Sequence, residues 1–157
     1  MTKNRKPVLS DGREVKIHTS EDFRYMKKAG VLAAEVLDFI IPHVKPGITT
    51  GQLDLLCHEF IIDRGAIPAP LNYRGFPKSI CTSINHVVCH GIPADKYLKV
   101  GDIVNIDVTA IVNGWHGDTS RMFFVGDVSV KCKNLVSATY NSMMNAISCL
   151  LYTSPSP

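Results

Sequence analysis

The sequence predicts an α+β protein in which helices cover an antiparallel sheet. Three observations carry this prediction. Two early segments have apolar residues at helical spacing, a later stretch alternates polar and apolar residues on both sides of Asn113-Gly114, and helical spacing returns near the end. With 157 residues, of which 45% are hydrophobic and 20% charged, the chain has the length and composition of one globular domain.

The first predicted helix begins at Thr19-Ser20-Glu21-Asp22, after a polar N-terminal extension of residues 1–18. A Thr or Ser side chain caps the free N–H groups of a helix start, and acidic residues suit the positive end of the helix dipole. Pro42 and Pro46-Gly47 are expected to end this helix. The inward positions predicted from the spacing are Phe23, Met26, Ala33, Val36, Leu37 and Ile40.

A second helix is predicted from Thr49, because Gln52 occupies the capping-box position. Gly65 is placed to end it, since glycine readily adopts the left-handed conformation that closes a helix. Its apolar stripe is expected to consist of Leu53, Leu56, Phe60 and Ile61. Residues 66–73 are expected to form a loop, and residues 76–93 mix strand-like alternation with turn residues.

The central predicted element is a β-hairpin. Residues 103–112 and 115–125 alternate around Asn113-Gly114, a pair that favours a tight two-residue turn because both turn residues must accept a positive φ. A two-residue loop fixes the register of the strands and places Val112 opposite Trp115.

Two aspartates are predicted to share one face of this hairpin. Counting back from the turn pairs Thr109 with Asp118, and the period of two then places Asp107 diagonal to Asp118, about 7–8 Å away. Asp is disfavoured in strands, and two on one face repel unless a positive charge lies between them. The pattern therefore predicts a metal site for a hard cation or a pair of them. The alternative is that Asp107 hydrogen-bonds a neighbouring loop and Asp118 pairs with Arg121 or Lys99.

The bulk properties favour a cytoplasmic protein. The chain has five cysteines, an odd number without CxxC spacing, which predicts reduced and mostly buried thiols at Cys57, Cys81, Cys89, Cys132 and Cys149. It has no apolar run of signal-peptide or membrane-spanning type. The net charge is +3, and Lys3-Asn-Arg-Lys6 is interpreted as a solvated arm. We therefore expect neither membrane association nor nucleic-acid specificity.

Helical spacing returns over residues 134–151. The predicted inward positions are Leu135, Ala138, Tyr140, Met144, Ile147 and Leu151. The tail, residues 150–157, ends in Ser-Pro repeats and resembles translated sequencing-adapter sequence, so we interpret it as a truncation artefact. A natural flexible terminus is the alternative.

Several stretches together resemble one family, the type I methionine aminopeptidases. Their sequences are most similar to those of bacterial, and in particular alphaproteobacterial, members. The resemblance runs from about Ser20 to about Ile147. Its stretches are Lys45-Pro-Gly47, Asn72-Tyr-Arg-Gly-Phe-Pro-Lys-Ser-Ile-Cys81, Ser83-Ile-Asn-His-Val-Val-Cys-His-Gly-Ile-Pro93, Gly101-Asp-Ile-Val-Asn-Ile-Asp-Val-Thr109 and Gly114-Trp-His-Gly-Asp-Thr-Ser-Arg-Met-Phe124.

The resemblance implies the pita-bread fold, two pseudo-symmetric α/β halves around a dinuclear metal site. Residues 19–149 would be the N-terminal half of that catalytic domain. Family members remove the initiator methionine from nascent polypeptides when the next residue is small. The implied cofactors are two divalent ions per site (cobalt, manganese, iron or zinc), and the implied setting is a cytoplasmic monomer with the ribosome as a candidate partner.

The resemblance also assigns roles to the two aspartates and to one histidine. Asp107 matches the aspartate that binds one metal, and Asp118 matches the aspartate that bridges both. His90 matches the histidine that hydrogen-bonds the substrate near the scissile amide, and without the family it would be interpreted as a core or surface residue. Three other histidines match no family role and are interpreted as packing or surface residues: His58, His86 and His116.

Five further residues match family positions. Tyr73, Phe76 and Cys81 correspond to residues that line the pocket for the methionine side chain, with ordinary core packing as the alternative. Asn85 and Val87 correspond to the loop that holds a monovalent cation through main-chain carbonyls in some members, which implies one such ion here.

One part of the family pattern is missing from the sequence after Asp118. The family completes its metal site from its second half with one histidine and two glutamates, and no such motif follows here. We therefore expect little or no peptidase activity from this chain alone. Two alternatives remain. A proline-directed aminopeptidase relative is disfavoured by Tyr73, Phe76 and Cys81, and an inactive pita-bread binding module is disfavoured by the two aspartates and His90.

Overall fold

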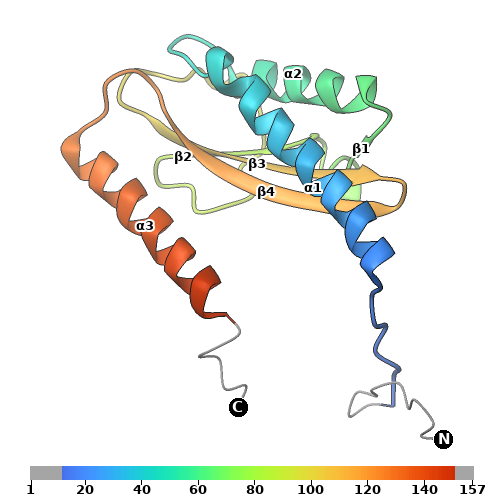
Figure 1. Cartoon of the computed structure of the whole chain (residues 1–157). Helices are drawn as coiled ribbons and strands as arrows, with labels where there is room; N and C mark the ends of the chain where they lie inside the picture. The colour runs from blue at the N-terminus through green and yellow to red at the C-terminus, as the bar shows by residue number, and fades with distance from the viewer. Residues whose placement is uncertain (1–11, 151–157) are drawn as a thin grey trace, which may run out of the picture.

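The computed structural model describes residues 12–150. Helices and an antiparallel sheet form the core, as the α+β prediction requires (Figure 1). In chain order the elements are α1 (Ser20–Ile40), the 3-10 turn η1 (Ile41–His43), α2 (Thr50–Asp63), β1 (Ile67–Pro68), the 3-10 turn η2 (Tyr73–Gly75), β2 (Cys81–Ile84), β3 (Ile103–Val112), β4 (Trp115–Phe124) and α3 (Val130–Cys149).

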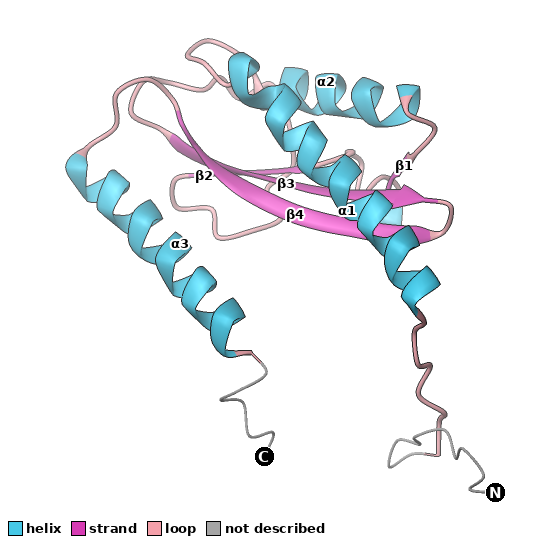
Figure 2. Ribbon diagram, in the orientation of Figure 1, coloured by secondary structure: helices cyan, strands magenta, loops and turns pink. Residues whose placement is uncertain are grey.

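Strand β3 is the centre of the sheet. It pairs along its whole length with β4 on one side, and on its other side it pairs with β2 near its start and with β1 near its end, all antiparallel. Helices α1 and α2 pack against each other and against the sheet, whereas α3 extends away from it (Figure 2). The core lies between the two helices and the buried face of β3, where Ile106 and Val108 are fully buried.

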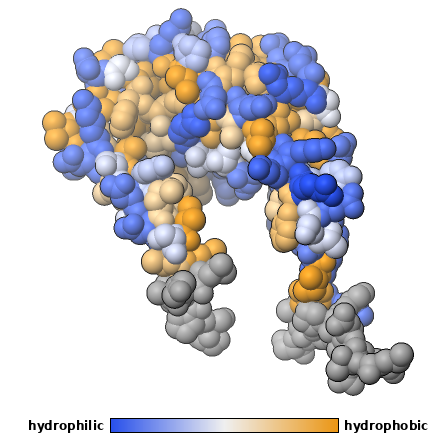
Figure 3. Space-filling model, viewed as in Figure 1, coloured by the Kyte–Doolittle hydropathy of each residue, from blue (hydrophilic) through white to orange (hydrophobic). Residues whose placement is uncertain are grey.

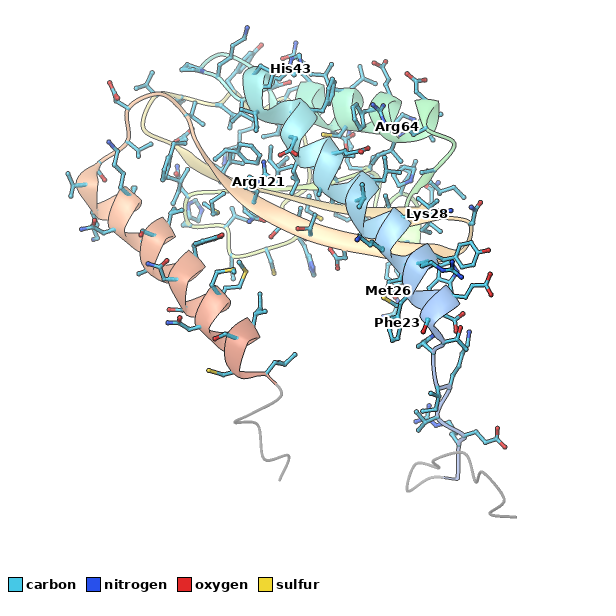
Figure 4. All side chains as sticks on the ribbon, viewed as in Figure 1. Phe23, Met26, Lys28, His43, Arg64 and Arg121 are labelled. Atoms are coloured by element: carbon cyan, nitrogen blue, oxygen red, sulfur yellow. The ribbon has the colours of Figure 1, made fainter. Side chains whose placement is uncertain are left out.

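Helix α1 begins where the sequence predicts. Thr19 forms a capping box with Asp22, since the Asp22 amide donates to Thr19 Oγ1 at 3.2 Å and the Thr19 amide donates to Asp22 Oδ2 at 2.7 Å. The predicted inward positions Phe23 and Met26 are wrong, because these side chains are 57% and 40% exposed on the first turns of the helix (Figure 4). Helical spacing identifies a face, but it does not say how far the sheet extends beneath that face.

The first buried residue of α1 marks its crossing with β4. A Cβ added to Gly117 would lie 2.1 Å from the backbone carbonyl of Ala29, so helix and strand touch backbone to backbone at this point. Gly117 directly precedes Asp118, and successive strand residues point to opposite faces. The close crossing therefore leaves the Asp118 side chain on the face that α1 does not cover.

Helix α2 also follows the prediction. Thr49 and Gln52 form the capping box, and Gly65 follows the helix end with a φ of 68°. Within the predicted stripe, Leu53 and Ile61 are buried, and Leu56 and Phe60 are partly buried against the core. The loop predicted over 66–73 instead contains the two-residue strand β1, which is too short to leave a periodic signal.

The predicted packing of the last helix is wrong. Helix α3 starts at Val130, earlier than expected, with Ser129 Oγ accepting from the Cys132 amide at 3.2 Å. No residue of α3 is buried, so the helical spacing has no layer to pack on, and Figure 3 shows hydrophobic residues along this helix. The exposed positions that were expected to face inward are Leu135, Ala138, Tyr140, Met144 and Ile147, and Leu151 lies outside the described residues.

The cysteines are only partly as predicted. Of the five, only Cys57 and Cys81 are buried, whereas Cys89 and Cys149 are exposed. Among the helices in residues 12–150, none has both the length and the apolar character needed to span a bilayer. Except for Leu150, the tail interpreted as an artefact lies outside the described residues, as do residues 1–11 of the N-terminal extension.

Candidate metal site and pocket

The hairpin has the predicted register. Val112 lies opposite Trp115, Thr109 lies opposite Asp118, and Asp107 lies opposite Ser120. The turn between the strands has positive φ at both residues, 50° at Asn113 and 82° at Gly114. Asp118 is therefore the diagonal neighbour of Asp107 on the same face of the sheet.

The two carboxyl groups interact directly. Burial raises the pKa of Asp107 above its ordinary value, and the negative charge of Asp118 and a hydrogen bond with its side chain raise it further, whereas His90 lowers it. Two carboxylates that share so small a space are stabilised by a proton or a cation between them. The pair is therefore able to bind a hard divalent cation.

The alternative partner proposed for Asp118 is engaged elsewhere. Arg121, labelled in Figure 4, donates from its guanidinium to Asp38 Oδ1 of α1 at 2.8 Å. Arg121 lies an odd number of residues after Asp118 and so points to the opposite face of β4. Within residues 12–150, no ion pair joins Asp118 to a lysine or an arginine.

A cavity of about 740 Å³ opens beside the aspartate pair. It brings together all six residues expected at the catalytic, metal and methionine sites: Tyr73, Phe76, Cys81, His90, Asp107 and Asp118. The other lining residues are Ala69, Pro70, Arg74, Gly75, Pro77, Ile92, Thr109 and His116. Carboxylates thus lie next to an apolar and aromatic wall, the combination of a ligand pocket with a few convergent polar groups.

Strand β2 places a thiol beside the carboxylates. Cys81 is the register partner of Asp107 across the β2–β3 pair. Burial, followed by the charge of Asp107, raises the pKa of Cys81 to about 11. The thiol is therefore protonated at neutral pH, and it serves as a neutral, polarisable part of the wall and not as a thiolate ligand.

His90 is held at the cavity by the residue that follows it. Gly91 packs so closely on β2 that an added Cβ would lie 2.1 Å from the Thr82 carbonyl oxygen. The Thr82 amide donates to the Gly91 carbonyl at 2.8 Å, and the Gly91 amide donates to Ser83 Oγ at 3.2 Å. His90 itself is exposed and has a φ of 53°, a left-handed conformation that is rare outside glycine and is often found at functional sites.

The aromatic wall comes from a tight turn around η2. Two of its non-glycine residues have positive φ, 66° at Asn72 and 49° at Arg74, and the Asn72 amide donates to the Phe76 carbonyl at 2.8 Å. Phe76 is half-buried, whereas Tyr73 is 64% exposed. Core packing therefore does not explain Tyr73, which stands at the rim of the cavity.

Sequence reasoning missed His116, which it interpreted as a packing or surface residue. His116 lines the cavity on the same strand face as Asp118, two residues away. The period of two along β4 was the available signal. Of the other two unassigned histidines, His58 is hydrogen-bonded to Ser79 and His86 is exposed.

The loop predicted to hold a monovalent cation lies outside the cavity lining. Asn85 has a φ of 52°, its side-chain amide donates to Asp102 Oδ1 at 2.8 Å, and its side-chain oxygen accepts from the Ile103 amide at 3.1 Å. The Val87 amide donates to the Ile84 carbonyl at 3.0 Å. These hydrogen bonds fix the turn, and the binding of a monovalent cation to it stays a prediction.

The aspartate pair has the chemistry of metal ligands. Asp107 and Asp118 are the carboxylate oxygen donors that hard divalent cations prefer. However, within residues 12–150 there is no group of three or more His, Cys, Asp or Glu side chains arranged to hold a metal ion. Divalent cations take four or more ligands, so the aspartate pair needs further donors to bind one tightly.

Comparison with known proteins identifies the family of the chain. Residues 24–152 match the model of metallopeptidase family M24. A methionine aminopeptidase from Rickettsia prowazekii is 68% identical over 133 residues, which are 85% of this chain and 51% of that protein. This match is consistent with the alphaproteobacterial character expected from the sequence.

Two solved structures share the fold. The crystal structure of methionine aminopeptidase from Rickettsia prowazekii has a TM-score of 0.82 at 68% identity and covers 83% of this chain and 52% of that chain. The methionine aminopeptidase of Thermotoga maritima has a TM-score of 0.81 at 34% identity, over 85% and 54%. The chain spans about half the length of the relatives it matches. It therefore belongs to metallopeptidase family M24, whose pita-bread fold it shares over that length.

Proposed function

We propose that this chain is part of a metal-dependent methionyl aminopeptidase that removes the N-terminal methionine of nascent polypeptides when the next residue is small. The observation that carries the proposal is the cavity in which the Asp107–Asp118 pair meets the wall formed by Tyr73, Phe76 and Cys81. The high identity to methionine aminopeptidases supports it.

In this proposal Asp107 and Asp118 hold two divalent ions, cobalt, manganese, iron or zinc. When bound, such ions activate water and polarise the scissile carbonyl. Asp118, which is exposed and diagonal to Asp107, would be shared by both ions. Burial, and after it the charge of Asp118, raises the pKa of Asp107, and a cation between the two carboxylates would relieve the part that is due to their repulsion.

The other residues act on the substrate. His90, at the edge of the cavity, donates a hydrogen bond near the scissile amide and stabilises charge that develops there. Tyr73, Phe76 and the neutral Cys81 thiol contact the methionine side chain, since aromatic and sulfur surfaces suit an unbranched, polarisable thioether. The carbonyls of Asn85 and Val87 are proposed to hold a monovalent cation that stabilises this loop.

The relatives are longer than the segment that this chain matches. We propose that the remaining metal ligands come from a polypeptide segment that corresponds to the unmatched part of those relatives. We accordingly propose little or no peptidase activity for the 157-residue chain alone. We further propose that the enzyme is cytoplasmic and monomeric and that it acts on its substrates at the ribosome.

A chimera tests the proposed function. In it, residues 20–149 replace the matched residues of the Rickettsia prowazekii relative, which are 68% identical. We expect the chimera to release methionine from Met-Ala-Ser in the presence of manganese or cobalt and to stop when a chelator is added. The chain alone should leave the peptide intact under the same conditions.

The same assay separates the alternatives. A folded chimera that cleaves an Xaa-Pro peptide and leaves Met-Ala-Ser intact would support a proline-directed enzyme. A folded chimera that binds peptides with no turnover and no metal dependence would support a binding module. Either result would overturn the methionine aminopeptidase proposal.

A further inference from the structure

Asp54 is an acidic residue on the buried side of α2, outside the cavity. Leu53, Cys57 and Ile61 on the same side belong to the core, and Asp54 is only 7% exposed. A carboxylate removed from water is strongly destabilising unless hydrogen bonds compensate it. Its partners therefore indicate what this residue does for the protein.

The partners of Asp54 are two consecutive backbone amides. Asp54 Oδ1 accepts from the Ser79 amide at 2.8 Å and from the Ile80 amide at 3.1 Å, and Lys78 Nζ lies 3.8 Å from Oδ2. One helical turn later, His58 Nδ1 is 2.8 Å from Ser79 Oγ. Two side chains of α2 thus hold one short segment, residues 78–80, and Ser79 in that segment is 2% exposed.

This segment lies between two parts of the cavity wall. Phe76 and Pro77 precede it and line the cavity, and Cys81 follows it, lines the cavity and pairs with Asp107. Strand β2 is only four residues long, Cys81–Ile84, and its register pairs with β3 begin at Cys81, so residues 78–80 lie just before the sheet. The hydrogen bonds of Asp54 therefore fix the point at which the chain enters the site.

We propose that Asp54 is a positioning residue of the candidate site, holding Ser79 and Ile80 so that Phe76 and Cys81 form the wall that recognises the substrate side chain. The identification of that side chain as methionine rests on the proposed function. The structural part of the proposal, namely that Asp54 positions Cys81, can be tested without enzymatic activity.

The first test measures thiol protection in the 157-residue chain. Labelling by iodoacetamide, followed by mass spectrometry, gives separate rates for Cys81 and Cys57, both of which are buried. Asp54→Ala removes two charge-assisted hydrogen bonds, so we expect Cys81 to label faster by about tenfold or more. Cys57 lies on α2 and is 0% exposed, and it should stay protected if only the segment loosens.

Asp54→Asn is the rescuing variant. Its amide oxygen can still accept from both backbone amides, but its charge is gone. Burial is the main cause of the raised pKa of Cys81, and the charge of Asp54 adds to it. A purely electrostatic effect would therefore accelerate labelling in Asn and Ala variants alike, whereas a positioning effect accelerates it in the Ala variant only. Glu59→Ala, an exposed acid on the same helix, is the matched control and should behave like the parent.

The second test uses the chimera and asks which kinetic constant changes. Asp54→Ala should raise KM for Met-Ala-Ser by about tenfold while kcat falls less than about twofold, because a displaced wall weakens side-chain binding and leaves the reacting groups in place. Asp54→Asn should restore KM. An inactive parent chimera would overturn the proposed function and leave the labelling test to decide the role of Asp54.

Three outcomes contradict the positioning role. Cys81 could stay protected in Asp54→Ala, Cys81 and Cys57 could become reactive together, or Asn could fail to rescue. The first would show that the segment holds its place without Asp54. The second, if it occurs in the Ala variant only, would show that Asp54 supports the whole fold, because loss of its charge, which also raises the pKa of Cys57, would act in the Asn variant as well. The third would show that the charge of Asp54 is what matters.

Discussion

At the scale of single residues, the carboxylate pair is the feature most sharply defined by the sequence. The Asn113-Gly114 turn has only one two-residue register, and counting from it places Asp118 diagonal to Asp107. The sequence could not reveal Asp54 or His116 in the same way. Asp54 sits within an apolar helical stripe, and its partners Ser79 and Ile80 are 25 and 26 residues away. Long-range hydrogen bonds of this kind leave no local pattern.

The carboxylate pair should lower the stability of the metal-free protein. An acid whose pKa is raised in the folded state contributes stability below its ordinary pKa of 3.8, and this contribution is lost as the pH rises through the raised value. Asp107→Asn should therefore match the parent near pH 3 and exceed it at pH 7. The expected gain is up to about 1 kcal/mol, the scale of a cross-strand pair.

Urea unfolding at both pH values checks this prediction. Asp127→Asn, which neutralises an exposed acid outside the cavity, is the control and should change stability little at either pH. If Asp107→Asn were less stable than the parent at pH 7, neither burial nor repulsion by Asp118 would be destabilising the charged form of Asp107, and a cation would not be needed between the two carboxylates.

At the scale of elements, helix ends were predicted well and helix burial less well. Capping boxes at Thr49 and Thr19 are local signals, and both are present. Burial depends on what lies beside the helix. The first turns of α1, with Phe23 and Met26, and all of α3 have apolar residues without a covering layer among the described residues. Strand β1 was missed because two residues carry no period.

The crossing of α1 and β4 gives a matched pair of glycine substitutions. Gly117→Ala should destabilise the protein by about 2 kcal/mol or more, because its Cβ would collide with the backbone of Ala29. Gly30→Ala has open space and lies within α1, so it should stabilise by about 0.5–1 kcal/mol. Thermal unfolding distinguishes the two. Equal effects would mean that the helix does not touch the strand at Gly117.

A second element, the start of α2, anchors the loop that follows Ile92. Thr50 is 2% exposed, and its hydroxyl donates to the Ala94 carbonyl and accepts from the Ala94 amide, both at 3.0 Å. Thr50→Val removes the acceptor of the Ala94 amide, whereas the Ala94 carbonyl keeps the Gly51 amide as a donor at 2.8 Å. The change should cost about 1–3 kcal/mol in unfolding free energy. Thr50→Ser keeps the hydroxyl and should recover most of it. A Val variant as stable as the parent would show that water replaces the hydroxyl.

At the scale of the whole molecule, the sequence predicts the fold and the family. What limits the candidate site is the number of metal ligands that the described residues provide. The register, the His90 segment and the wall residues all converge on one cavity. Two carboxylates do not satisfy a divalent cation, and the chain spans about half of its relatives. The aspartate pair therefore needs further donors from outside the described residues before it can hold a divalent cation tightly.

The exposed helix α3 gives a prediction at this scale. Because none of its residues is buried, Ile147→Ser should change the unfolding free energy of the 157-residue chain by less than about 0.5 kcal/mol. Ile106→Ser, a fully buried residue of β3, is the contrasting variant and should unfold the chain at much lower urea concentration. A comparable loss from both would show that α3 is packed in solution.

The measurement that tests the central claim most directly is methionine release from Met-Ala-Ser by the chimera carrying Asp118→Asn. If Asp107 and Asp118 form the metal site, this single change should lower turnover by a factor of about a thousand or more, with loss of bound manganese, while Asp127→Asn leaves both unchanged. Turnover and metal content equal to those of the parent chimera in Asp118→Asn would contradict the account.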